Sequence, residues 1–196
     1  MRILVANEHP PQLELMARAA QALGEEVVAR EVRVDAVARV AAEESADVAL
    51  VGLPRGESAE HALALISELV AGGLCPVVVV TRNSDPDVLA DAAALGIYAH
   101  TSDLEPLALR SAIDVAARRF ADHAHIKAAL EKRTLVERAK GILMERYGLD
   151  EHAAFEMLRR EARNENLRLA AAAELILQGH RLLPKHHAHP RRRSAG

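Results

Sequence analysis

The chain of 196 residues is poor in cysteine and in aromatic residues. It holds one cysteine, no tryptophan, two phenylalanines and two tyrosines. Because a single cysteine cannot form an intramolecular disulfide, a disulfide-stabilised secreted domain is excluded. No apolar run approaches the roughly 18 residues of a membrane-spanning helix, and the first residues lack the apolar stretch and cleavage site of a signal peptide. We therefore expect a cytoplasmic protein.

The shortage of aromatic residues also restricts the core. Half of the residues are apolar, so the core must consist mainly of Ala, Val, Leu and Ile, which suits helices packed on a Val-rich parallel sheet. The net charge of −3 hides a division along the chain: residues 1–127 hold 11 Lys/Arg and 19 Asp/Glu, and residues 128–196 hold 14 and 9. A polyanion would bind the second part, although a short basic tail supplies most of its excess.

Short β-branched runs alternate with helical patterns through the first half. The runs at 2–6, 26–31, 47–52 and 76–81 are typical of strands, and a weaker fifth lies at 97–100. Several of the helical segments between them end in glycine, a frequent helix stop. This order predicts an α/β fold with a doubly wound five-stranded parallel sheet.

Beyond Pro106 the pattern is helical. Residues 107–147 contain no proline, and no glycine before Gly141, which predicts one long connecting helix or two nearly continuous ones. Its imperfect apolar stripe forms either a dimer seam or a surface that packs on its own domain. The stripe comprises Leu109, Ile113, Ala116, Phe120, Ala124 and Leu130.

Two shorter helices and a tail follow. Gly148 ends the long helix, Asp150 is placed to cap the next one, and a third helix begins near Asn166. The tail at 181–196 has no periodicity and is expected to be disordered. Its three histidines, with His180, lack Cys or carboxylate partners, so we expect no metal site there.

Residues 1–118 resemble the receiver domains of response regulators. In that family an acidic pair after the first strand and an aspartate after the third hold Mg²⁺, and this aspartate accepts a phosphoryl group. A Thr or Ser after the fourth strand and a Lys after the fifth contact the phosphoryl oxygens. In this sequence the corresponding residues are Asn7, Glu8, Gly52, Thr81 and Asp103.

These residues predict a degenerate phosphorylation pocket. Gly52 has no nucleophile, and Asp103 reverses the charge of the expected Lys. Asp47 begins the same strand, but five extended residues place it roughly 16 Å from Gly52. We therefore expect a pseudo-receiver that responds to an unknown protein or small molecule. His9 and His100 are expected near the same edge of the sheet, as surface residues rather than as a metal or ligand site.

Residues 130–177 hold a continuous pattern of basic, small and apolar residues. It comprises Arg133, the run AKGILM at 139–144, Gly148, the segment AFEMLRREA at 154–162, Asn166, and the pattern of Leu169, Ala173 and Ile176. With these residues the segment closely resembles the ANTAR domain without a gap. The resemblance implies a three-helix module that binds paired RNA hairpins in nascent leader transcripts and prevents formation of a terminator. The implied domains are the receiver-like 1–118, a helical linker at 119–129, the ANTAR domain at 130–180 and the tail.

RNA hairpins present phosphates and splayed bases, which call for Arg and Lys on rigid helices and for small residues at points of close approach. Tyr147 and Phe155 are the only aromatic side chains in this segment, so recognition must depend on charge and hydrogen bonds more than on stacking. Matched by position, the implied RNA-binding residues are Arg133, Arg138, Lys140, Gly141, Arg159 and Arg163.

Together these features predict a non-enzymatic RNA-binding antitermination regulator, a homodimer through the connecting helix, with no cofactor. No nucleophile and base stand at usable spacing, and no phosphate loop or metal motif is present. A ligand- or protein-sensing adaptor is one alternative. A DNA-binding response regulator is another, although the Ala- and Leu-rich helix from Asn166 does not suit a recognition helix.

Overall fold

A computed structural model describes residues 1–53, 58–81 and 86–181. The chain forms two compact units, Met1–Ala124 and His125–Gly196, and their boundary falls inside the linker predicted at 119–129. The elements are β1 (Arg2–Ala6), α1 (Pro10–Ala22), β2 (Glu26–Glu31), α2 (Val34–Glu43), β3 (Val48–Leu53), α3 (Ser58–Gly72), β4 (Val77–Thr81), α4 (Pro86–Leu95), β5 (Ala99–Thr101), α5 (Pro106–Tyr147), α6 (Glu151–Asn164) and α7 (Leu169–Arg181).

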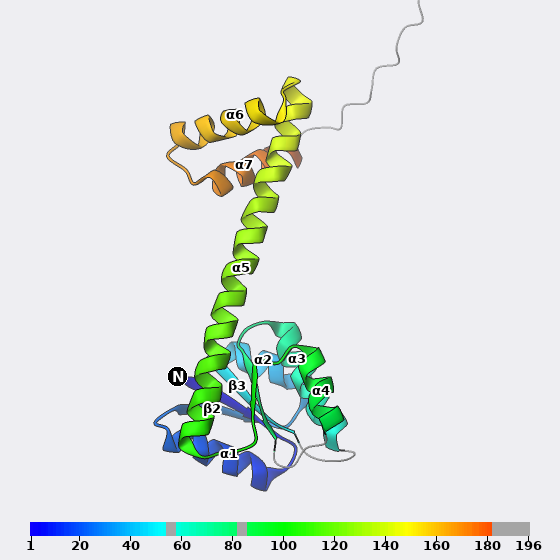
Figure 1. The fold of residues 1–196 in the computed structure, drawn as a ribbon, viewed down its shortest axis with the longest axis vertical. Coiled ribbons are helices and arrows are strands. Elements are labelled where there is room, and N and C mark those ends of the chain that lie inside the picture. The colour runs from blue at the N-terminus through cyan, green and yellow to red at the C-terminus, as the bar shows by residue number, and fades with distance from the viewer. Residues whose placement is uncertain (54–57, 82–85, 182–196) are drawn as a thin grey trace, which may run out of the picture. The chain divides into compact units, whose positions relative to one another are not determined.

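The first unit is a three-layer α/β fold. Its strands are parallel in the order β2-β1-β3-β4-β5, which confirms the predicted doubly wound sheet. Helix α1 and the first part of α5 cover one face, and α2, α3 and α4 cover the other (Figure 1). Since both faces are covered, β3 and β4 are buried at every residue, as their nearly continuous apolar sequences require.

Three strand bounds differ from the predictions. β4 begins at Val77 because Pro76 has no N–H to donate to the sheet, although its carbonyl accepts a hydrogen bond from Ala49. β3 lies one residue later than predicted, at Val48–Leu53. β5 is Ala99–Thr101 rather than 97–100. Tyr98 lies directly before it: its N–H donates to Val77 O of β4, and its carbonyl accepts a hydrogen bond from Arg119 on α5.

The second unit is a small helical core. The end of α5 packs with α6 and α7 through small side chains, which let helices approach closely. The predicted cap is confirmed: the Asp150 carboxylate accepts a hydrogen bond from Ala153 N at 2.7 Å. The buried residues of this core are Ala139, Leu143, Ala154, Leu158, Ala162, Ala172 and Ala173.

The predicted start of the third helix is wrong by three residues. Asn166 has a φ of 53°, the left-handed conformation that Asn tolerates better than most residues. Leu167 N then donates to Ala162 O at 2.7 Å, so this turn closes α6 rather than opening α7. Helix α7 begins at Leu169 and ends at Arg181, and the rest of the predicted tail lies outside the described residues.

The apolar stripe of α5 divides into two parts. Leu109, Ile113 and Ala116 are buried against the sheet, so the first part packs on its own domain. In the second part Ala124 and Leu130 are exposed, and Leu130 is 59% exposed. Ile126, which is not part of the predicted stripe, is equally exposed one helical turn before Leu130. No helix among residues 1–53, 58–81 and 86–181 combines the length and apolarity needed to cross a membrane.

Candidate functional site

Three of the five predicted pocket residues meet at the carboxyl edge of the sheet. Asn7 follows β1, Gly52 lies in β3, and Thr81 ends β4 directly opposite Leu53. Asn7 is 1% exposed, and its Oδ1 accepts a hydrogen bond from His9 N at 2.7 Å. Its Nδ2 points at Gly52 and has no hydrogen-bond partner among the described residues.

The other two members of the predicted pocket have different contacts. Glu8 lies 3.9 Å from His61 Nδ1. Asp103 accepts a hydrogen bond from Glu105 N at 2.9 Å, which shapes the turn into α5. The Thr81 hydroxyl donates to the carbonyl of Thr101 at 3.3 Å, so it is already bonded to β5. Within the described part of the chain, no group of three or more His, Cys, Asp and Glu could hold a metal ion.

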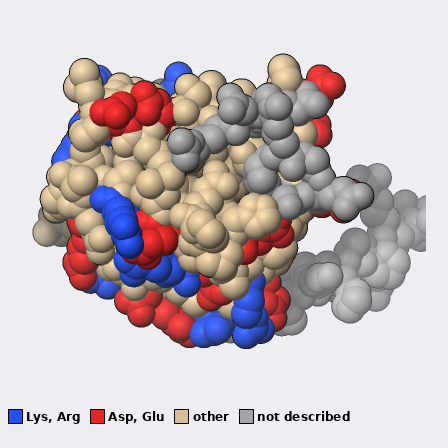
Figure 2. Space-filling model, turned by 90° about the horizontal axis from the view of Figure 1, so that it is seen from below, with Lys and Arg blue, Asp and Glu red and all other residues tan. Residues whose placement is uncertain are grey.

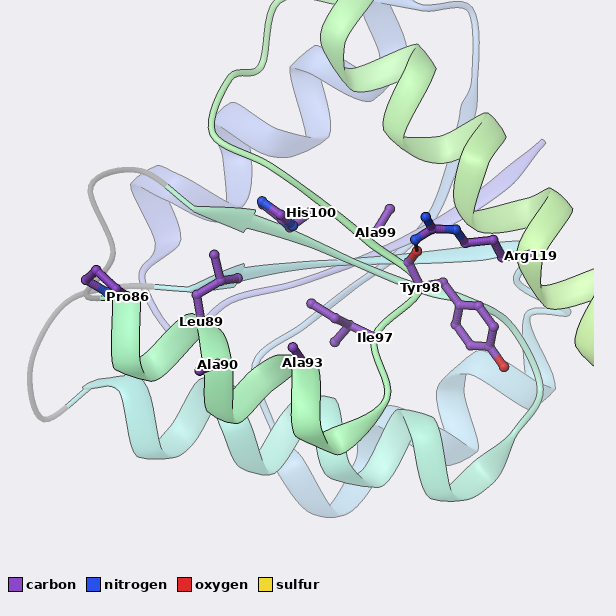
Figure 3. Close-up of a pocket in the computed structure, with 9 residues that line it drawn as sticks. All are labelled: Pro86, Leu89, Ala90, Ala93, Ile97, Tyr98, Ala99, His100 and Arg119. Atoms are coloured by element: carbon purple, nitrogen blue, oxygen red, sulfur yellow. Dashed lines mark hydrogen bonds between the residues drawn. The ribbon is translucent and has the colours of Figure 1, made fainter.

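A shallow groove of about 440 Å³ lies between α4, β5 and α5 (Figure 3). Leu89 and Ala93 of α4 form one wall, and His100 of β5 and Arg119 of α5 lie across from them. The Tyr98 ring packs edge-on against Phe120 of α5, at 5.3 Å between ring centroids. These contacts fix the start of α5 to the first unit.

In the second unit, Arg133, Arg138 and Gly141 are exposed on α5, as expected for a surface that meets a ligand. Gly141 stands two residues from both Ala139 and Leu143, which are buried, so it lies roughly 200° around the helix from either. A β carbon at Gly141 would have no described atom within 4 Å. Packing within the described chain therefore gives no reason for a glycine here.

Lys140 differs from the expectation of an exposed RNA contact. It is only 7% exposed, and its Nζ lies 2.7 Å from both Glu137 Oε2 and Glu151 Oε1. The hydrogen bonds with Glu137 and then Glu151 raise the pKa of Lys140, and the bond with Lys140 lowers the pKa of Glu151. The spacing of residues 137 and 140 could have indicated the first pair. The second depends on the crossing of α5 and α6, which sequence reasoning missed.

Arg159 and Arg163 are exposed one turn apart on α6. Arg159 lies 3.4 Å from Glu156, the pairing that its spacing permits. Of the two candidate stacking residues, Tyr147 is 55% exposed, with the Arg146 guanidinium 5.9 Å from its ring centroid, and Phe155 is partly buried. Figure 2 shows a face of the first unit, where basic and acidic side chains lie beside one another among uncharged residues rather than forming one basic surface.

Comparison with known proteins agrees with both units. Residues 124–177 match the ANTAR domain. The chain therefore joins a receiver-like fold to a C-terminal ANTAR domain. It is 32% identical over 141 residues to the transcriptional regulatory protein PdtaR of Mycobacterium tuberculosis, a match that covers 65% of this chain. The chain spans about 64% of the length of the curated relatives it matches.

Solved structures show the same fold for the first unit. The signal receiver domain of a modulated diguanylate cyclase from Desulfovibrio desulfuricans has a TM-score of 0.52 and 17% identity, with 62% of this chain and 97% of that chain covered. The N-terminal receiver domain of RstA from Klebsiella pneumoniae has a TM-score of 0.50 and 20% identity, with 60% and 99% covered. At such identities the likeness concerns the fold alone.

Proposed function

We propose that this protein is an RNA-binding antitermination regulator that binds tandem hairpins in leader transcripts. The observation that carries the proposal is the ANTAR domain at 124–177, with its exposed cations on α5 and α6. Arg133, Arg138, Arg159 and Arg163 offer charged forks that match phosphate and base edges. Gly141 lies on the same face of α5 as Arg138, three residues before it, and its lack of a side chain leaves room for RNA to approach the helix there.

The first unit acts in this proposal without conventional aspartyl phosphorylation. Gly52 offers no carboxylate, and the amide of Asn7 fills the space beside it. The Thr81 hydroxyl is bonded to Thr101, and Asp103 gives no cation for a phosphoryl oxygen. A partner protein or a small molecule would supply the signal in place of a phosphoryl group.

A homodimer formed through α5 fits two exposed apolar side chains on this helix, Leu130 of the predicted stripe and the neighbouring Ile126. Ile126 and Leu130 lie one helical turn apart, and both are exposed. Two copies of the helix paired along these residues would bury them and bring together two ANTAR domains. That arrangement suits an RNA target with two hairpins.

The test compares the full chain's binding to a tandem-hairpin leader RNA and to a duplex DNA of equal length across a salt series. We expect a preference for RNA. Arg138→Ala should weaken RNA binding and reduce the slope of log affinity against log salt by about one. Arg39→Ala, an exposed arginine of the first unit, is the matched control and should change neither. Equal binding to both nucleic acids would mean unspecific charge attraction, and preference for DNA would favour the DNA-binding alternative.

A further inference from the structure

We infer that Lys140 is a positioning residue that fixes the corner between α5 and α6, and that it does not contact RNA. This inference rests on the proposed function, because it says which residues of the ANTAR domain meet the transcript. Of the basic residues predicted to bind RNA, the arginines are exposed and can reach a phosphate, whereas the buried Lys140 is paired with carboxylates of the protein itself.

The geometry of Lys140 connects two helices. Glu137 lies one turn before it on α5, whereas Glu151 is the first residue of α6, directly after the capping Asp150. Both carboxylates lie 2.7 Å from Nζ, the distance of a charge-assisted hydrogen bond. The ammonium group therefore joins the end of the long helix to the first turn of the next.

Burial makes this role more favourable than RNA contact. The Lys140 side chain is 9% exposed, whereas Glu137 and Glu151 are 52% and 73% exposed. To reach a phosphate, the lysine would have to leave its two carboxylates and its buried position. The carboxylates would then be unpaired close to a polyanion, which is electrostatically unfavourable.

The two roles predict opposite effects when the carboxylates are removed. If Lys140 holds the corner, the double variant Glu137→Gln with Glu151→Gln should weaken RNA binding, as Lys140→Met does. If Lys140 contacts RNA, the same change frees the ammonium group, and binding should become stronger. Glu131→Gln with Glu174→Gln is the control for the loss of two negative charges, because both residues are exposed in the same unit.

The experiment measures RNA affinity across a salt series and hydrogen exchange of the α6 amides, with the full chain and each variant. We expect Lys140→Met and the double variant of Glu137 and Glu151 to lose affinity on the order of tenfold with an unchanged salt slope, since no phosphate contact is removed. Exchange in the first turn of α6 should rise in both. Adding Lys140→Met to the double variant should change little further, and Lys140→Arg should recover part of the loss.

A salt slope reduced by about one in Lys140→Met, with α6 exchange unchanged, would overturn the inference. Stronger RNA binding by the double variant of Glu137 and Glu151 than by its control would overturn it as well. If the unmodified protein binds no RNA, the proposed function fails, and hydrogen exchange alone decides the role of Lys140. If α6 exchange then rises in Lys140→Met and in the double variant, and combining them adds little, the positioning role of Lys140 is supported. Unchanged exchange refutes that role. Should Lys140→Met fail to fold, Glu151→Gln alone replaces it in the hydrogen-exchange measurement, where exchange in the first turn of α6 should rise. The RNA affinity of the double variant of Glu137 and Glu151, compared with its control, then decides between the two roles.

Discussion

The amide nitrogen of Asn7 lies so close to Gly52 that it would clash with a β carbon there. The two residues are interlocked, because the Asn7 side chain fills the space into which a side chain at residue 52 would project. Asn7 Cγ and Met16 Sδ each lie 3.1 Å from the same position. The absence of a phosphoacceptor aspartate at residue 52 and the presence of the Asn7 amide in the space beside it are therefore one structural feature.

The first prediction concerns this interlock. Gly52→Ala should destabilise the first unit by about 1–3 kcal/mol, because a buried amide must move and break its bond with His9. Asn7→Ala should reduce that cost, so the double variant should lose less stability than the sum of the single variants. Urea unfolding measures the difference. Gly179→Ala, where a β carbon meets only open space, is the control, and an equal effect at both glycines would contradict the interlock.

The second prediction concerns phosphorylation. Incubation with acetyl phosphate and Mg²⁺ should leave the mass of the protein unchanged, since residue 52 has no carboxylate. Gly52→Asp should also remain unmodified, because the new carboxylate meets the Asn7 amide at the edge of β3 and Asp103 supplies no cation for a phosphoryl oxygen. Intact-protein mass spectrometry distinguishes these cases. A stable gain of one phosphoryl group by the unmodified chain would refute the pseudo-receiver hypothesis.

The third prediction concerns Gly141, where one substitution should raise fold stability and lower RNA affinity. Gly141→Ala should stabilise the second unit by about 0.5–1 kcal/mol, because a glycine inside an exposed helix is unfavourable. The same methyl group should weaken RNA binding, if RNA approaches α5 closely at this point. Gly179→Ala in α7 should stabilise to a similar degree without changing RNA affinity. Unaltered RNA binding by Gly141→Ala would remove this surface from the proposed interface.

The fourth prediction concerns self-association. Ile126→Glu with Leu130→Glu should leave the helix content unchanged and convert a dimer to a monomer, because like charges would face each other across the seam. Light scattering after size-exclusion chromatography reports the mass. Val115→Glu, at another exposed apolar residue of α5, is the control. A monomeric unmodified protein would contradict the proposed seam.

The sequence pattern predicted the fold well where the signal was local and periodic. The strands at 2–6 and 26–31 match the observed β1 and β2, and Asp150 caps α6 as its position predicts. The start of the third helix was placed too early, near Asn166, because the left-handed conformation of Asn166 closes α6 and does not begin α7. Lys140 shows a different limit. Its burial and its contact with Glu151 depend on how two helices cross, and an isolated helical pattern does not contain that information.

The last prediction concerns pH and the same corner. The pKa of Glu151 in the folded protein is lowered from its ordinary value of 4.5 by the hydrogen bond with Lys140. Its contribution to stability is therefore complete above pH 4.5 and is lost as the pH falls through the lower folded value. Lys140 has a pKa raised above 10.5, first by Glu137 and then by Glu151. Its contribution is complete below pH 10.5 and is lost as the pH rises through the higher folded value.

Glu151→Gln is the variant that tests this dependence, because it removes the titrating group and keeps the shape. The melting temperature of the unmodified protein should exceed that of the variant by a constant amount between about pH 6 and 9, where neither group titrates. The difference should shrink below pH 4.5 as the carboxylate takes up a proton, which an amide cannot do. Circular dichroism of both proteins across this range measures it. A difference that persists unchanged down to about pH 3, below the ordinary carboxyl range, would mean that Glu151 stabilises α6 without its charge, and that the ion pair with Lys140 does not hold the corner.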